Sequence, residues 1–244
     1  MRQLIFIFLA LFLIACGPGR EVDPTADWTV EQFYAEARKE LGNKNYLTAI
    51  EYYETLESRF PFGKYATQAQ IDVAYAYYKY DEPDSAITAL DRFIKLHPRH
   101  PSVDYAYYLK GLVNAKRGGT ILDVLVERDI SDFDKNLLLT AYNDFKALLQ
   151  RFPSSRYATD AKKRMIYLRN QLARADYSIA SYYATRDAWV AVANRTKFIL
   201  HNYQGSSVIR QTLELQLQAY QRLGMDDLAR DTQRIIDLNY NQDS

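Results

Sequence analysis

The sequence predicts an all-α protein that is built from about five helix–turn–helix units. Apolar residues recur at the three- and four-residue spacing of helices over most of the 244 residues, and alternating apolar and polar stretches, which indicate strands, are nearly absent. Small residues and prolines recur along the first half at a constant interval, as in stacked helical repeats. We therefore expect a repeat array, in which each unit packs on its neighbour.

Residues 1–15 have the features of a secretory signal. Arg2 is followed by an unbroken apolar run from Leu4 to Ala15. A helix needs roughly 20 apolar residues to cross the core of a bilayer, so the run is too short for the alternative, a transmembrane anchor. We expect the signal to be removed on export.

The signal ends at Leu13-Ile14-Ala15-Cys16, which resembles the lipobox of bacterial lipoproteins. Cys16 is the single cysteine, so it cannot form an internal disulfide, and the alternative of a free thiol has no evident use. The resemblance implies that Cys16 carries diacylglycerol and an N-linked acyl chain such as palmitate, which is a durable anchor. Gly17, which is not aspartate, implies sorting to the outer membrane of a Gram-negative cell. No other cofactor is expected.

Residues 16–28 are expected to form a flexible tether, because they are rich in Gly, Pro and charge and lack apolar periodicity. About eleven extended residues reach no more than roughly 40 Å, so the folded part works close to the membrane. The chain has 31 basic and 30 acidic residues, and loss of Arg2 with the signal leaves it nearly neutral. Nucleic acid is therefore not an expected partner.

Residues 29–154 are predicted to form three repeats. Thr29 and Gln32 have the spacing of a capping box, which begins the first helix. The pattern resembles a tetratricopeptide repeat: a small residue is followed twelve positions later by a second small residue, and after twelve more by a proline. Small side chains let the two helices of a unit approach each other, and the proline ends the second helix. This triplet occurs twice, 37 positions apart, at Ala37, Ala49 and Pro61 and at Ala74, Ala86 and Pro98.

The third repeat contains an insertion. Gly111 stands 37 positions after Ala74, as expected, but the next small residue of the pattern is Ala141, and the proline is Pro153. The extra length predicts an insertion at about residues 117–135, on one face of the array. Loops of this length are more often functional than idle.

Residues 155–244 are predicted to form repeats four and five. Ser155 is expected to cap a long helix that continues to Tyr183. The next helix begins near Trp189 and ends near Tyr203, and the last pair turns at Leu223-Gly224. The whole is predicted to be a right-handed superhelix of about five tetratricopeptide repeats, a shape suited to holding an extended peptide or another protein.

Several strings, in their order and spacing, resemble the BamD family, the tetratricopeptide-repeat lipoproteins of the β-barrel assembly machinery. The resemblance covers nearly the whole chain and is carried by the lipobox, the repeats and the strings Arg59-Phe60-Pro61-Phe62-Gly63, Ala74-Tyr75-Ala76-Tyr77-Tyr78-Lys79, Asp91-Arg92-Phe93-Ile94, His97-Pro98-Arg99-His100-Pro101 and Trp189-Val190-Ala191-Val192-Ala193-Asn194-Arg195.

The resemblance implies a non-enzymatic scaffold on the periplasmic face of the outer membrane. It would bind unfolded outer-membrane β-barrel proteins through residues 29–154 and the polypeptide-transport domain of the barrel-forming subunit BamA through residues 155–244, together with other Bam lipoproteins. Carried over by motif, Phe60, Phe62 and Tyr65 would be substrate-binding, and Arg195 would contact BamA.

The insertion departs from the family pattern. The family commonly has an Asp-Arg-Ser segment followed closely by Arg-Asp, whereas here Phe133 stands in place of the second arginine, within Glu127-Arg128-Asp129-Ile130-Ser131-Asp132-Phe133-Asp134. The contact that this arginine makes in the family is therefore in doubt here.

Simpler interpretations of these residues are also open. Most of the 21 tyrosines are expected to pack between helices with the hydroxyl at the rim, and Arg195 on its own is a solvated arginine. A locally basic fourth unit is usually a solvated face, although an acidic partner would suit it; its cations are Lys162, Lys163, Arg164, Arg169 and Arg174.

Metal binding and catalysis find little support. His97 and His100 flank Pro98, but zinc needs three or four ligands, and the only other histidine is His201. No phosphate loop, nucleophile elbow or helical metalloprotease motif is present, which disfavours a hydrolase. The main alternative to barrel assembly is a periplasmic repeat lipoprotein that organises peptidoglycan synthesis or cell division.

Overall fold

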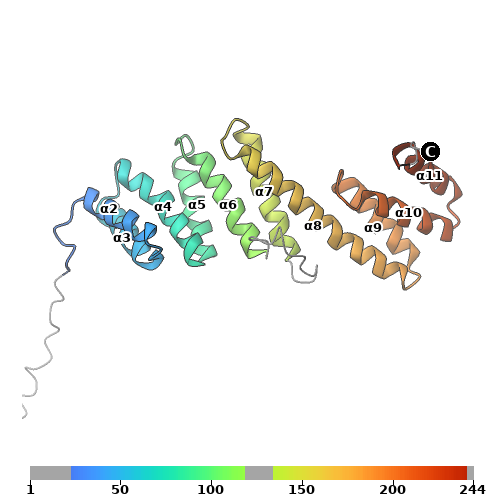
Figure 1. Ribbon diagram of the computed structural model, residues 1–244, viewed down its shortest axis with the longest axis horizontal. Helices are drawn as coiled ribbons and strands as arrows, with labels where there is room; N and C mark the ends of the chain where they lie inside the picture. Colours follow the sequence, from blue (N-terminus) through green and yellow to red (C-terminus); the bar gives the residue numbers. More distant parts are fainter. Residues whose placement is uncertain (1–22, 119–133, 241–244) are drawn as a thin grey trace, which may run out of the picture.

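The computed structural model describes residues 23–118 and 134–240, and within these ranges it contains ten helices and no strand. The helices follow one another in an elongated row from α2 at one end to α11 at the other (Figure 1). The all-α prediction and the five helix pairs are confirmed. The signal, Cys16 and most of the predicted insertion, including Phe133, lie outside the described residues.

Each repeat is a pair of helices that are adjacent in sequence and pack on each other. Helices α2, α4 and α6 also pack in succession, as do α8 and α10, so that each unit is stacked on the next. The pairs are α2 (Val30–Gly42) with α3 (Tyr46–Arg59), α4 (Lys64–Tyr80) with α5 (Pro83–Leu96), α6 (Val103–Arg117) with α7 (Lys135–Arg151), α8 (Ala158–Ala184) with α9 (Trp189–Asn202), and α10 (Ile209–Arg222) with α11 (Asp226–Tyr240).

The small residues of the repeat lie where helices meet. Each alanine of the predicted pattern is completely buried: Ala37, Ala49, Ala74, Ala86 and Ala141. At Gly111 a Cβ atom would lie only 2.6 Å from the Phe145 ring, so α6 and α7 can approach this closely only because position 111 has no side chain. The regular spacing of small residues in the sequence therefore marks the positions at which neighbouring helices touch.

Two kinds of turn alternate along the array. Within a unit, a residue with left-handed backbone joins the two helices in each of the four pairs whose turn the structure describes: Lys44, Asp81, Asp187 and Gly224. Between units, the helix ends two residues before Pro61, Pro98 or Pro153, because the residue before a proline avoids the helical region. The prolines in the sequence therefore mark where α3, α5 and α7 end.

The helix starts show one correct and one wrong prediction. The capping box is present: Gln32 N donates to Thr29 Oγ1 and Thr29 N donates to Gln32 Oε1. Ser155 does not cap α8, whose N-cap is Tyr157. Instead its hydroxyl accepts a hydrogen bond from Tyr157 N at 3.1 Å and donates one to Asp104 at 2.7 Å. The turn at Arg156 and Tyr157 separates Ser155 from the start of α8, so Ser155 contacts the neighbouring unit.

The apolar core continues through the middle of the array. Phe145 of α7, Leu168 and Leu172 of α8 and Ile199 of α9 are buried in one cluster. Residue 155, at which the two predicted halves divide, therefore falls in a turn over a core that both halves share. Within the described part of the chain, none of the helices has the length and hydropathy needed to cross a membrane.

Candidate interaction surfaces

The turn between α3 and α4 carries Phe60 and Phe62, and the third predicted substrate-binding residue, Tyr65, lies in the first turn of α4. The Phe60 ring packs on the buried Phe33 ring, with centroids 6.3 Å apart. Phe62 is 89% exposed. Gly63 has a φ of +103°, which favours glycine and turns the chain into α4 directly after Phe62. The turn thus holds one aromatic ring against the core and presents another to solvent.

Tyr65 belongs to a network that leads inward from this turn. Its ring lies 5.2 Å from that of Tyr34, whose hydroxyl donates to Asp72 Oδ2 at 2.9 Å. Gln68 Nε2 donates to the other oxygen of Asp72 at 2.9 Å. Burial raises the pKa of Asp72, and these hydrogen bonds oppose that shift. The Tyr53 hydroxyl, also buried here, has no hydrogen-bond partner among the residues that the structure describes.

Asp72 and Gln68 also line a groove of about 1030 Å³ that crosses the second and third repeats. The other walls are the turns before α6 and α8 and the helix ends beside them. They contribute both cations and an acid: Arg99, Arg151, Arg156 and Asp104. The groove is polar and open at the surface. Sequence reasoning identified these turns by their prolines but did not predict that they border one groove.

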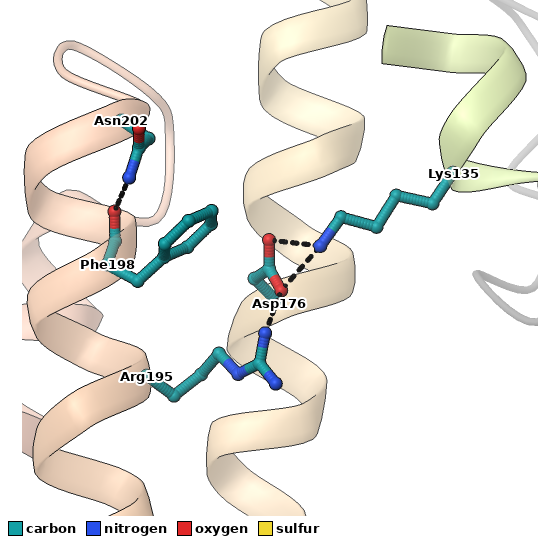
Figure 2. Close-up of polar contacts among 5 residues, drawn as sticks. All are labelled: Lys135, Asp176, Arg195, Phe198 and Asn202. Atoms are coloured by element: carbon teal, nitrogen blue, oxygen red, sulfur yellow. Dashed lines mark hydrogen bonds and ion pairs between the residues drawn. The ribbon is translucent and has the colours of Figure 1, made fainter.

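The fourth repeat contains a buried carboxylate with two cations. Asp176 on α8 is completely buried. Lys135, the first residue of α7, places its Nζ 2.8 and 2.7 Å from the two Asp176 oxygens, and Arg195 on α9 places Nη1 3.0 Å from Oδ1. Figure 2 shows Asp176 between the two cations, which reach it from different helices. The cluster therefore joins α7, α8 and α9.

The surroundings of this cluster are partly aromatic. The Lys135 ammonium lies 5.7 Å from the centre of the Phe198 ring, and Phe198 is 42% exposed (Figure 2). Burial, and then the nearby Asp176 carboxylate, raise the pKa of Tyr203 above its ordinary value. Arg195 is one third exposed, so it is an ion-paired residue at the surface, and the alternative of a freely solvated arginine is wrong.

Comparison with known proteins identifies the family. The family model described as "Outer membrane lipoprotein", YfiO, matches residues 26–235. That range includes nearly all of the folded part and both sites described above. The chain belongs to the YfiO family of outer membrane lipoproteins.

Relatives of this YfiO-family protein carry one common name. A protein of Neisseria meningitidis serogroup A named outer membrane protein assembly factor BamD is 45% identical over 98% of this chain and 91% of its own length. The proteins of the same name from Vibrio cholerae and Haemophilus influenzae are 40% and 34% identical, over 95% and 98% of this chain and 95% and 90% of their own lengths. The resemblance to BamD is confirmed.

Solved structures include a tetratricopeptide repeat protein from Parabacteroides merdae. It has a TM-score of 0.40 and 10% identity to this YfiO-family chain, and the match covers 85% of this chain and 78% of the other.

Some cations of the YfiO-family fourth repeat have structural partners. Arg164 Nε donates to Asp160 at 2.5 Å, and Arg169 donates to the backbone carbonyls of Gln204 and Gly205. The simple interpretation of a solvated basic face is therefore wrong for these two arginines, whereas Lys162, Lys163 and Arg174 are exposed.

The two histidines have roles within the fold. His97 Nε2 lies 2.9 Å from Gln70 Oε1, His100 Nδ1 accepts from Ser102 N at 3.1 Å, and both rings lie 5.3 Å from the Phe93 ring. Across residues 23–118 and 134–240, no group of three potential metal ligands occurs.

Sequence reasoning missed Asp176 and Lys135. The signal was present, because Asp176 stands four residues after Leu172 and eight after Leu168, on the apolar stripe of a helix. A carboxylate on such a stripe must find cations or hydrogen bonds, so it marks a buried cluster.

Proposed function

We propose that this protein is a non-catalytic assembly factor for outer-membrane β-barrel proteins, anchored by lipid on Cys16. The observation that supports it most is the relative named outer membrane protein assembly factor BamD, which is 45% identical over 98% of the chain. The all-helical repeat architecture suits a protein that works by binding.

The first three repeats bind the unfolded substrate. Phe62 offers an exposed ring at the turn between α3 and α4, Phe60 and Tyr65 fix the shape of that turn, and the groove beside Asp72 accommodates an extended segment. Aromatic contact supplies affinity, and the polar groove wall supplies hydrogen bonds to the backbone of the bound strand.

The last two repeats bind the polypeptide-transport domain of BamA, with Arg195 as a contact. The exposed third of Arg195 and the neighbouring Phe198 ring form a basic and aromatic surface, and such residues are frequent among strong interface contacts. Two contacts on one array raise the effective concentration of substrate at BamA.

Depletion of the protein in its own cell tests the proposal. We expect the levels of β-barrel proteins in the outer membrane to fall before peptidoglycan composition changes. Normal barrel-protein levels after depletion would exclude the proposal, and a primary defect in peptidoglycan or division would favour the alternative.

A direct binding assay tests the two sites separately. The mature protein is titrated with a peptide that matches the last strand of a barrel protein, and in parallel with the soluble periplasmic domain of BamA. We expect Phe62→Ser to weaken only the peptide and Arg195→Met to weaken only BamA. No saturable binding to either probe would contradict the assignment.

A further inference from the structure

The groove that crosses the second and third repeats contains a carboxylate without a cation. Asp72 lines this groove from the middle of α4, and its two oxygens accept hydrogen bonds from the Tyr34 hydroxyl and the Gln68 amide, which are both neutral. Within the described part of the chain, no lysine or arginine forms an ion pair with Asp72. Of the groups that act on the pKa of Asp72, burial has the largest effect and raises it, and Arg38 has the smallest.

Comparable carboxylates of the chain are compensated. Asp176 has two cations on its oxygens, and Asp144, whose pKa is also raised by burial, has the Lys110 ammonium 4.0 Å from Oδ1. Asp104, the other acid of the groove, lies in the first turn of α6, where the helix dipole favours a negative charge. Asp72 lies in the middle of its helix and has neither kind of compensation. A partly buried carboxylate in this position gains free energy from a cation that a bound molecule supplies.

A neighbouring hydroxyl points to the same place. The Tyr53 ring lies 6.2 Å from the Tyr34 ring, and burial, followed by the Asp72 carboxylate, raises the pKa of the Tyr53 hydroxyl. Tyr53 is 1% exposed, and its hydroxyl finds no hydrogen-bond partner in the described ranges. The polar network under the groove thus contains a charge and a hydroxyl that the described fold does not pair.

We propose that Asp72 is a specificity-determining residue of the groove and pairs with a lysine or arginine side chain of the bound segment. The inference deepens the proposed function and rests on it, because the groove must first hold the unfolded substrate. A long basic side chain suits the site. Its apolar stem can lie along the ring of Tyr105, which also lines the groove, while its charged head reaches the Asp72 carboxylate.

The other charges of the groove confine this preference to one place. Three arginines, Arg99, Arg151 and Arg156, and two acids, Asp72 and Asp104, line it, so these five side chains carry a net charge of +1. Because like charges repel, a lysine added to a bound peptide should not strengthen binding at most positions. It should do so only at the position that meets Asp72.

A lysine scan of the bound peptide tests the proposal. The parent peptide matches the last strand of a barrel protein and carries norleucine, which keeps an apolar stem without the charge, in place of any basic residue. Each test peptide has one lysine, placed at each position in turn, and is titrated into the full mature chain in detergent at about 0.15 M salt. The variants are Asp72→Asn and, as the control, Asp144→Asn, which removes a largely buried carboxylate outside the groove. Urea unfolding shows whether both are folded.

We expect lysine at one position to raise the affinity of the wild type about tenfold over the parent peptide. Asp72→Asn should lose this gain, and Asp144→Asn should keep it. In the wild type the gain should shrink as pH falls toward about 4, because burial raises the pKa of Asp72 and the protonated carboxyl attracts no cation.

The remaining outcomes separate this inference from the proposed function. If the parent peptide binds but no lysine strengthens binding, or if the gain survives in Asp72→Asn, the inference fails and the substrate site stands. If no peptide binds, both fail. Should Asp72→Asn not fold, the wild type decides: a gain that shrinks toward about pH 4 supports the inference, and a gain that stays constant overturns it.

Discussion

Phe60 and Phe62 stand two positions apart in one turn and should respond differently to substitution. Phe62→Ser removes an 89% exposed ring, so the free energy of unfolding should change by less than about 0.5 kcal/mol while affinity for the barrel-protein peptide falls. Phe60→Ala removes a ring that packs on Phe33 and should cost about 1–3 kcal/mol. Urea unfolding and peptide titration on both variants check this, and a destabilised Phe62→Ser would contradict it.

Asp72 should make the folded state more stable as pH falls, which is the opposite of the usual effect of a carboxylate. Burial raises its pKa above the ordinary value of 3.8, so the folded state holds a proton more tightly than the unfolded state. Its contribution therefore favours folding more as pH falls toward about 4 and less as pH rises. In urea unfolding at about pH 7 and about pH 4, the wild type should gain stability relative to Asp72→Asn at the lower pH.

Asp23 is the matched control for this measurement. Hydrogen bonds from Thr25 lower its pKa, so its contribution is present above pH 3.8 and is lost as pH falls through the lowered pKa. The wild type should therefore show no gain in stability relative to Asp23→Asn at about pH 4, and it should lose stability relative to this variant only below pH 3.8. The same trend in both variants would show that Asp72 is not the source.

Single residues were also where prediction from sequence failed most often. The alternatives for Arg195 were a solvated side chain or a partner contact, and its ion pair with Asp176 depends on three helices meeting. Side-chain partners at sequence separations of 19 and 41 residues cannot be deduced from spacing along one helix. Ser155 was assigned to the wrong role for the same reason, since its partner Asp104 belongs to another unit.

At the scale of elements, the turns within repeats store strain. Lys44 has a φ of +67°, a region in which an L-residue is strained by roughly 1–2 kcal/mol. Glycine relieves this strain, but part of the gain is lost because glycine makes the unfolded chain more flexible. Lys44→Gly should therefore raise the free energy of unfolding by about 0.5–1 kcal/mol, as urea titration would measure.

The equivalent turn of the fifth unit is the control. Gly224 has the same φ of +67°, and no atom lies within 4 Å of where its Cβ would be, so Gly224→Ala tests backbone strain alone. It should lower stability by about 1 kcal/mol. An unchanged Lys44→Gly together with a destabilised Gly224→Ala would mean that the lysine side chain contributes to the fold.

The contact between α6 and α7 should not tolerate a methyl group. In Gly111→Ala the Cβ would lie 2.6 Å from a completely buried Phe145 ring, and such overpacking costs about 1–3 kcal/mol. This outweighs the roughly 1 kcal/mol gained by alanine in a helix, so thermal unfolding should occur at a lower temperature. Gly42→Ala, with open space around it, should be neutral or stabilising, and Phe145→Leu should partly rescue Gly111→Ala.

Elements were largely predictable, because their signals are local. A small residue at a helix contact, a proline after a helix and the capping box at Thr29 each depend on a few neighbouring positions. Lys44, Asp81 and Asp187 were not predicted as left-handed turn residues, since they lack the glycine that marks Gly224. The groove beside Asp72 requires turns from different units to meet, which no local signal reports.

At the scale of the whole molecule, membrane localisation should depend on the lipid at Cys16, whereas affinity for BamA should not. In the proposed function the partners contact residues 29–240, and Cys16 lies before them in the predicted tether, so Cys16→Ser should weaken membrane localisation more than affinity for BamA. Cell fractionation and titration with the periplasmic domain of BamA measure the two quantities. Complete loss of BamA binding in soluble Cys16→Ser would contradict this prediction.

The length of α8 has a mechanical consequence. The helix has 27 residues, so it is a stiff rod about 40 Å long that packs on α7 and on α9. A tilt of about 5° at one end would displace the other by about 3–4 Å. In the proposed function, such a rod would act as a lever between the third and fourth repeats, so that a small repacking at the repeats proposed to bind BamA would produce a larger displacement at the repeats proposed to bind the substrate.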